Sequence, residues 1–80
     1  MRKPLYYNID LEATGENISR LRKVRGMTVK DIQFYMGLEM PRAVYKWERG
    51  QSLPSLEHLM ALGRLFDLKI EEILIWNCPP

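Results

Sequence analysis

The sequence has very few of the residues on which enzymes and metal proteins most often depend. Its 80 residues include one cysteine, Cys78, and one histidine, His58. A lone histidine without a second ligand at the right spacing does not indicate a metal site. Gly-rich phosphate loops, paired catalytic carboxylates and nucleophile–base pairs are also missing from the sequence. We therefore predict a protein that is not an enzyme and that uses no metal, cofactor or small-molecule substrate.

Long apolar runs are missing as well. A run such as Ile73 to Trp76 is far too short to cross a membrane, and residues 1–8 lack the apolar stretch of a secretion signal. The single cysteine has no partner for an internal disulfide, which agrees with a reducing compartment. We expect a cytoplasmic protein without membrane contact. A chain of this length buries only about 60 per cent of its unfolded surface, which leaves room for one small core.

The net charge of +2 is small, but it is unevenly distributed along the chain. Residues 1–16 carry a net charge of −1, residues 17–51 carry +5 and residues 52–80 carry −2. A basic central segment is what attraction to nucleic-acid phosphates requires. The alternative is that this charge is only the uneven charge that small domains often have.

Apolar residues at helical spacing predict an all-α fold, a compact bundle of five helices. The expected helices cover about 17–25, 28–36, 41–50, 55–66 and 70–76. Asn17 and Thr28 are candidate N-caps, Pro41 suits a first helical turn, and Gly26 and Gly50 end helices. The residues expected to face inward are Ile18, Leu21, Val24, Val29, Ile32, Met36, Val44, Trp47, Leu56, Leu59, Leu62 and Phe66. The expected organisation is an N-terminal arm (1–16), one domain (17–76) and a short tail (77–80).

The third of these helices is the most informative segment. Val44 and Trp47 lie three residues apart, so both face inward. Arg42, Tyr45, Lys46 and Arg49 take the remaining positions and face outward. Gly37 lies just after the preceding helix, where the chain must turn. Two short helices joined by a tight turn are the helix-turn-helix geometry that places the second helix in a DNA major groove.

Several short motifs occur in the order and near the spacing of a known family. They are Ile18-x-x-Leu-Arg-x-x-Arg-Gly-Met-Thr28, Asp31-Ile, Met36-Gly37, Lys46-Trp-Glu-Arg-Gly50, Pro54-Ser-Leu-Glu57 and Glu71-Glu-Ile-Leu74. In this order they resemble the phage repressor and Cro type of helix-turn-helix, the Xre family, over residues 17–74. The resemblance implies a transcriptional regulator. The expected form is a repressor that binds an operator in double-stranded DNA as a homodimer.

The resemblance also implies roles for particular residues. Arg42, Tyr45 and Lys46 are expected to contact base edges. Thr28, Lys30, Arg49, Gln51 and Ser52 are expected to bind phosphates, partly through backbone amides near Gln51 and Ser52. Arg22 and Glu48 are expected to form a buried ion pair between the first and third helices. For Arg42 and Lys46 the alternative is an ordinary solvated helix face.

The chain departs from the family pattern near the turn. Val29 stands where the family commonly has a phosphate-binding glutamine, and Met40 stands where a capping residue is usual. The turn Gly37–Pro41 is one residue longer than the common form. Gln33 replaces the usual alanine, and the sequence offers no physical account of it. We therefore expect a looser start to the third helix, with the Glu39 carboxylate as a substitute acceptor for the missing cap.

Surplus apolar residues leave a second hypothesis open. Phe34 and Tyr35 fall where the family usually shows polar surface, and they are covered either by the arm, through Tyr6 and Tyr7, or by a partner. Ile75 and Trp76 form either a dimer contact or a contact under the carboxyl tail. The alternative function is therefore a protein-interaction module, or an antitoxin-like accessory subunit, with the same fold.

Overall fold

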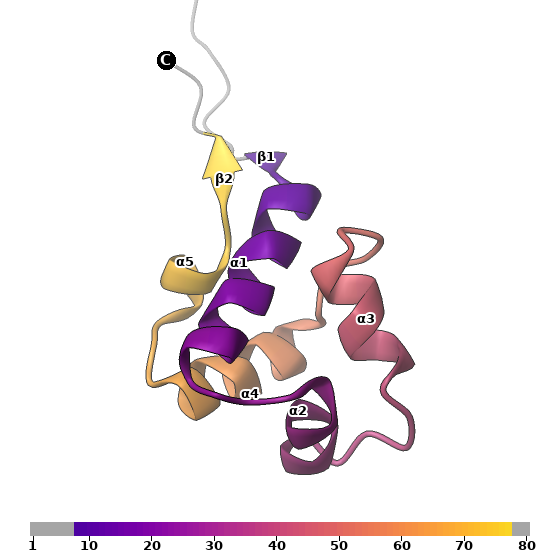
Figure 1. Ribbon diagram of the computed structural model, residues 1–80. Coiled ribbons are helices and arrows are strands. Elements are labelled where there is room, and N and C mark those ends of the chain that lie inside the picture. The colour runs from indigo at the N-terminus through magenta and orange to yellow at the C-terminus, as the bar shows by residue number, and fades with distance from the viewer. Residues whose placement is uncertain (1–7, 78–80) are drawn as a thin grey trace, which may run out of the picture.

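Five helices and one pair of very short strands make up the part of the chain that the computed structural model describes, residues 8–77 (Figure 1). In chain order the elements are β1 (Asn8–Ile9), α1 (Leu11–Val24), α2 (Val29–Tyr35), α3 (Arg42–Glu48), α4 (Leu56–Phe66), α5 (Ile70–Ile73) and β2 (Trp76–Asn77). The predicted five-helix, all-α architecture is confirmed. The two-stranded antiparallel sheet β1–β2 is an addition that the apolar pattern did not predict.

Side-chain caps explain where three of the helices begin. The Asp10 carboxylate accepts from the Ala13 amide at 2.9 Å and starts α1. Thr28 starts α2, as expected, and Ser55 starts α4 by accepting from the His58 amide at 3.2 Å. Each cap satisfies an amide that has no partner within its own helix. These helix starts are therefore encoded locally.

The first helix begins earlier than the sequence pattern indicated. Residues 11–16, which we expected in the arm, form the first turns of α1, and Asp10 rather than Asn17 is the cap. Asn17 lies inside the helix, where its side-chain amide donates to the carbonyls of Glu72 at 3.1 Å and Ile73 at 2.9 Å. The predicted end of the arm, at residue 16, is too late in the sequence. The reason is that Asn17, a residue type common at N-caps, instead binds the backbone of a segment distant in sequence.

Most of the expected core is buried. The buried apolar residues are Ile18, Leu21, Val29, Ile32, Val44, Trp47, Leu59, Leu62, Phe66 and Ile73. Val24 and Leu56 were also expected inside, but they are 70% and 67% exposed. Both lie at a helix end, the last residue of α1 and the first of α4. Helical periodicity gives the direction of a side chain, but not whether a neighbouring element reaches far enough to cover it.

The chain around Ile75 and Trp76 is extended, so the expected helix over 70–76 is wrong beyond Ile73. Ile9 pairs with Trp76 in the antiparallel sheet, and the Asp10 amide donates to the Ile75 carbonyl at 2.8 Å. The Ile75 amide donates to the Thr14 hydroxyl at 2.9 Å. Asn77, assigned to the tail, belongs to β2. Partners more than 60 residues away in the sequence take these backbone groups out of helix α5.

The two strands lie at one end of the molecule and α2 lies toward the other (Figure 1). Phe34 and Tyr35 on α2 are 80% and 65% exposed. The suggested cover from Tyr6 and Tyr7 falls outside the described residues, as does Cys78. Among the described residues no helix is long and apolar enough to cross a membrane.

Helices α1 and α3 touch backbone to backbone at Gly15. A Cβ there would overlap the carbonyl oxygen of Trp47 and lie 2.8 Å from that of Glu48. Gly15 belongs to the segment expected as an N-terminal arm (1–16), but it lies within α1 at the helix crossing. Its missing side chain is what allows this close approach.

Replacing Gly15 by alanine tests that crossing. On an exposed helix face the change stabilises a protein by up to about 1 kcal/mol. Here we expect the free energy of unfolding to fall by about 1–3 kcal/mol, because the added methyl group forces α1 and α3 apart. Chemical denaturation measures the change, and Glu16→Ala, at an exposed neighbouring position of α1, is the control. A gain in stability for Gly15→Ala would contradict the close crossing.

Candidate nucleic-acid interface

Helix α3 is held against the protein through one face. Val44 is fully buried and Trp47 is 4% exposed. The Trp47 indole also packs against the His58 ring on α4, with ring centroids 5.3 Å apart. The single histidine therefore makes an aromatic contact under α3. Among residues 8–77, no three His, Cys, Asp or Glu side chains gather into a group that could hold a metal ion.

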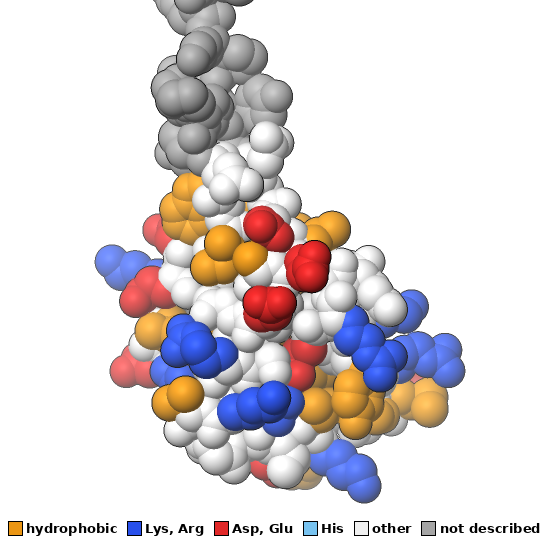
Figure 2. Space-filling model, turned by 45° about the horizontal axis from the view of Figure 1, so that its top comes forward, with side chains coloured by type: hydrophobic (Ala, Val, Ile, Leu, Met, Phe, Trp, Pro, Cys, Tyr) orange, Lys and Arg blue, Asp and Glu red, His pale blue; other side chains and the backbone are white. Residues whose placement is uncertain are grey.

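The opposite face of α3 carries the residues expected to contact bases, and Arg49, expected to bind phosphate, follows at the C-cap. Arg42, Tyr45, Lys46 and Arg49 are all exposed. The Arg49 guanidinium lies 5.6 Å from the centre of the Tyr45 ring, a cation–π contact that orients both side chains. On the α3 side of the molecule, at right in Figure 2, Lys and Arg side chains project around apolar ones. Helix α3 therefore combines an apolar inner face with a basic and aromatic outer face.

The residues expected to bind phosphate lie at the two ends of the helix-turn-helix. Thr28 and Lys30 are exposed at the start of α2, and Gln51 and half-buried Ser52 follow α3. The expected use of the Gln51 backbone amide for phosphate is corrected. This backbone N–H donates to the Lys46 carbonyl at 2.9 Å, so the Gln51 side chain is left to donate to a phosphate. This bond belongs to the turn that follows α3, in which Gly50 has a φ of 71°.

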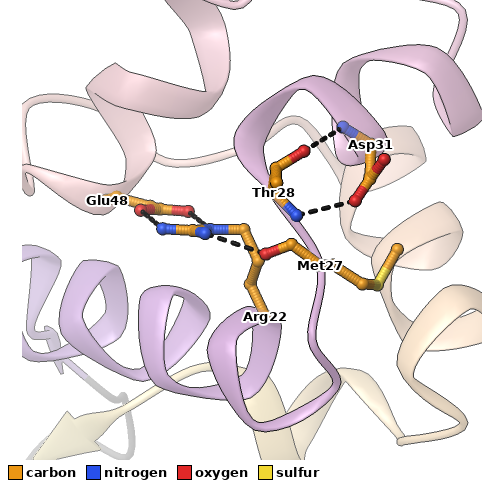
Figure 3. Close-up of polar contacts among 5 residues, drawn as sticks. All are labelled: Arg22, Met27, Thr28, Asp31 and Glu48. Atoms are coloured by element: carbon orange, nitrogen blue, oxygen red, sulfur yellow. Dashed lines mark hydrogen bonds and ion pairs between the residues drawn. The ribbon is translucent and has the colours of Figure 1, made fainter.

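Thr28 also has a structural role, as the N-cap of α2. Its hydroxyl accepts from the Asp31 amide at 3.1 Å, and the Asp31 carboxylate accepts from the Thr28 amide at 2.7 Å (Figure 3). This reciprocal pair is a capping box. The hydroxyl hydrogen is still available to donate to a phosphate oxygen.

The ion pair expected between Arg22 and Glu48 is present and joins α1 to α3 (Figure 3). The Arg22 Nε donates to Glu48 Oε2 at 2.7 Å and its Nη2 donates to Oε1 at 3.0 Å. The Arg22 Nη1 donates to the Met27 carbonyl at 2.9 Å, just before α2. The two side chains are only 13% and 11% exposed. One guanidinium thus ties together α1, the start of α2 and the end of α3.

The hydrogen bonding of the Arg22 guanidinium to the Glu48 carboxylate raises the pKa of Arg22 above its ordinary value, against the opposing effect of burial. A group whose pKa is raised by folding stabilises the fold fully below its unfolded pKa and loses this contribution as the pH rises through the folded pKa. For an arginine both values are strongly alkaline. The arginine side of this pair therefore stays charged and stabilising at neutral pH.

Gln33, within α2, contacts the turn between α2 and α3, a role that the sequence did not reveal. The Gln33 side-chain amide donates to the carbonyls of Leu38 at 3.4 Å and Glu39 at 3.1 Å. The conventional cap that Met40 replaces is missing, as expected, but Glu39 does not substitute for it: no side chain caps α3, and Pro41 occupies the N-cap position. A local signal was present, a long amide side chain near a lengthened turn, but only the fold shows which carbonyls it reaches.

Two short helices joined by a tight turn, with the second presenting a basic outer face, define a helix-turn-helix protein. The helix-turn-helix family matches residues 18–73. The chain therefore belongs to the Xre-type helix-turn-helix family, that of the phage repressors and Cro, and is a DNA-binding regulator.

Solved structures agree with this assignment. The restriction-modification controller protein C.AhdI from Aeromonas hydrophila is 30% identical, with a TM-score of 0.72 over 80% of this chain and 96% of that one. A transcriptional regulator from Listeria innocua is 30% identical, with a TM-score of 0.70 over 80% of this chain and 64% of that one. The clp gene regulator ClgR from Corynebacterium glutamicum, 20% identical, has a TM-score of 0.72 over 82% and 69% and shows a shared fold. Among curated proteins, none matches the sequence significantly.

Breaking the Arg22–Glu48 pair tests its contribution to stability. Glu48→Ala leaves a largely buried guanidinium without its carboxylate, so we expect a loss on the order of 3 kcal/mol. For a domain of this size the melting temperature should fall by roughly 12–24 °C. Thermal melting at neutral pH measures it, with Glu39→Ala, the removal of an exposed carboxylate, as the control.

A double variant separates the ion pair from packing alone. Arg22→Met with Glu48→Leu removes both charges and keeps apolar volume, so it should recover much of the stability that Glu48→Ala loses. A Glu48→Ala protein that melts within a degree or two of the parent would contradict the role given to the pair.

Proposed function

We propose that the protein is a repressor that binds an operator in duplex DNA with α3 in the major groove. It would block transcription by occupying that site, as a cytoplasmic protein and without catalysing a reaction. The observation that carries the proposal is the two-faced character of α3: Val44 and Trp47 anchor it, while Arg42, Tyr45, Lys46 and Arg49 stay exposed. A rigid helix with a basic free face is suited to contact base edges in a major groove.

Within that face, Arg42 and Lys46 are the candidates for base contacts. They lie one helical turn apart on the same side of α3. An arginine can donate two hydrogen bonds to guanine O6 and N7, a pattern that no other base offers. Tyr45, held by Arg49, flanks them. We therefore expect guanine in the preferred DNA site.

Phosphate contacts would come from the segments on either side of α3. Thr28 and Lys30 lie at the start of α2. The side chains that follow the carboxyl end of α3 are those of Arg49, Gln51 and Ser52. Contacts to phosphate fix the orientation of a protein on DNA and carry no direct sequence information. This division of roles predicts which substitutions change specificity and which change affinity alone.

Binding as a homodimer completes the proposal. The seven residues of α3 extend over roughly 10 Å, which spans about three base pairs. Three base pairs cannot specify an operator by themselves, so two copies that place their α3 helices about 34 Å apart would supply the rest.

A protein-interaction module is the second candidate, favoured by one observation. Phe34 and Tyr35 form an exposed edge-to-face pair with ring centroids 5.6 Å apart. Beside them lies a depression lined by Tyr35, Met36, Ala61, Arg64 and Leu65. A salt titration on random duplex distinguishes the two candidates, because DNA affinity falls steeply with salt whereas a module that binds only protein shows little DNA binding at any salt.

Arg42→Ala tests the base contact, once selection from a random duplex pool has given the preferred site. We expect the affinity for that site to fall by about 1–3 kcal/mol because the paired hydrogen bonds to guanine are lost. Affinity for random duplex at the same salt should change little. The measurement is a binding titration on both duplexes.

Gln51→Ala is the matched control for Arg42→Ala, since it changes an exposed polar residue assigned to phosphate. It should weaken preferred and random duplex alike. An Arg42→Ala protein that loses affinity equally for both would identify Arg42 as a phosphate contact and move the base-contacting face elsewhere.

Half-site spacing tests the homodimer. On a duplex with two preferred half-sites about one turn apart, sedimentation should show two chains bound. Inserting about five base pairs turns the second half-site to the opposite side of the DNA, so affinity should fall toward that of a single half-site. Equal affinity before and after the insertion would mean that the two chains bind independently.

A further inference from the structure

We propose that Gln33 is a positioning residue for DNA binding: it fixes the turn that sets the direction of α3 relative to α2. The proposal rests on the DNA-binding role proposed above and adds to it a residue that does not touch DNA.

The amino end of α3 lacks support from its own sequence. Pro41 at the N-cap has no side chain that can accept a hydrogen bond, and no side chain caps the helix. The helix has seven residues, so its own hydrogen bonds are too few to hold it straight in isolation. Its burial through Val44 and Trp47 fixes the middle and the carboxyl end. The position of Arg42, the first residue of α3, therefore depends on the turn before it.

Gln33 holds that turn from two sides. Its backbone carbonyl accepts from the Leu38 amide at 3.0 Å, and its side-chain amide donates to the carbonyls of Leu38 and Glu39. Both bonds to carbonyls require the NH₂ group, which settles the orientation of the amide. Leu38 packs against the core, so the bracing extends from α2 through the turn to the buried interior.

The consequence for DNA binding follows from geometry. The carbonyl of Glu39 precedes Arg42 by three residues, so a turn that moves shifts the base-contacting side chain with it. Base contacts require hydrogen-bond distances to be met closely, whereas phosphate contacts through long flexible side chains tolerate small shifts. Loss of the Gln33 amide should therefore reduce specificity more than general affinity.

Gln33→Met provides the test, because methionine keeps the length and shape of the side chain and cannot donate. We expect its affinity for the preferred duplex to fall by roughly tenfold, about 1.4 kcal/mol, while its affinity for random duplex stays within about twofold. Equal losses on both duplexes, or no loss on either, would overturn the proposal. Lys30→Met is the matched control on α2: as a phosphate residue it should weaken both duplexes alike.

A second measurement needs no DNA and keeps the two proposals separate. Hydrogen exchange of the free protein should be faster at the Leu38 amide and in the first turn of α3 in Gln33→Met, with amides of α1 and α4 unchanged. Unchanged exchange at the turn would overturn the bracing role, whatever the DNA results. A third outcome is that Gln33→Met speeds exchange at the turn while the parent protein binds no duplex selectively. In that case the bracing role stands and the proposed DNA-binding function fails.

Discussion

The contact between α1 and α3 is the constraint on which the rest of the structure depends. At Gly15 the two helices meet without a side chain between them, and about two turns further along α1 the pair Arg22–Glu48 closes the contact with two charge-assisted hydrogen bonds. Arg22 also binds the Met27 carbonyl, so the same side chain places the start of α2. An ion pair this well covered is stabilising only while both partners are present.

This arrangement explains how a helix of seven residues can serve as a rigid surface. Short helices are marginal in water, and α3 has no side-chain cap at its start. Its stability comes from tertiary contacts: from Trp47 in the core, from the ion pair of Glu48 with Arg22 of α1, and from the hydrogen bonds of the Gln33 side chain to the preceding turn. Because all of these act on the inner face and the ends, the outer face keeps its exposed basic side chains.

The chain ends show the same division between local and distant interactions. Segments 8–9 and 76–77 pair as strands, and the side chains of Thr14 and Asn17 on α1 bind the backbone of the carboxyl-terminal segment. Polar residues on α1 thus do what a longer α5 would otherwise do, which is to satisfy the backbone groups around Ile75. The carboxyl-terminal segment is docked by hydrogen bonds more than by helix packing.

The sequence alone determined the number of helices, the inward positions of Val44 and Trp47 and the basic outer face of α3, because these follow from a local period of 3.6 residues and from capping residues. The resemblance to a family supplied the pairing of Arg22 with Glu48. Only the tertiary structure decided that α1 starts at Leu11, that the expected helix end near Trp76 is a strand, and that Gln33 braces a turn. Each of these depends on where carbonyls and amides of another segment lie, and a local pattern carries no information on contacts that the folded chain creates.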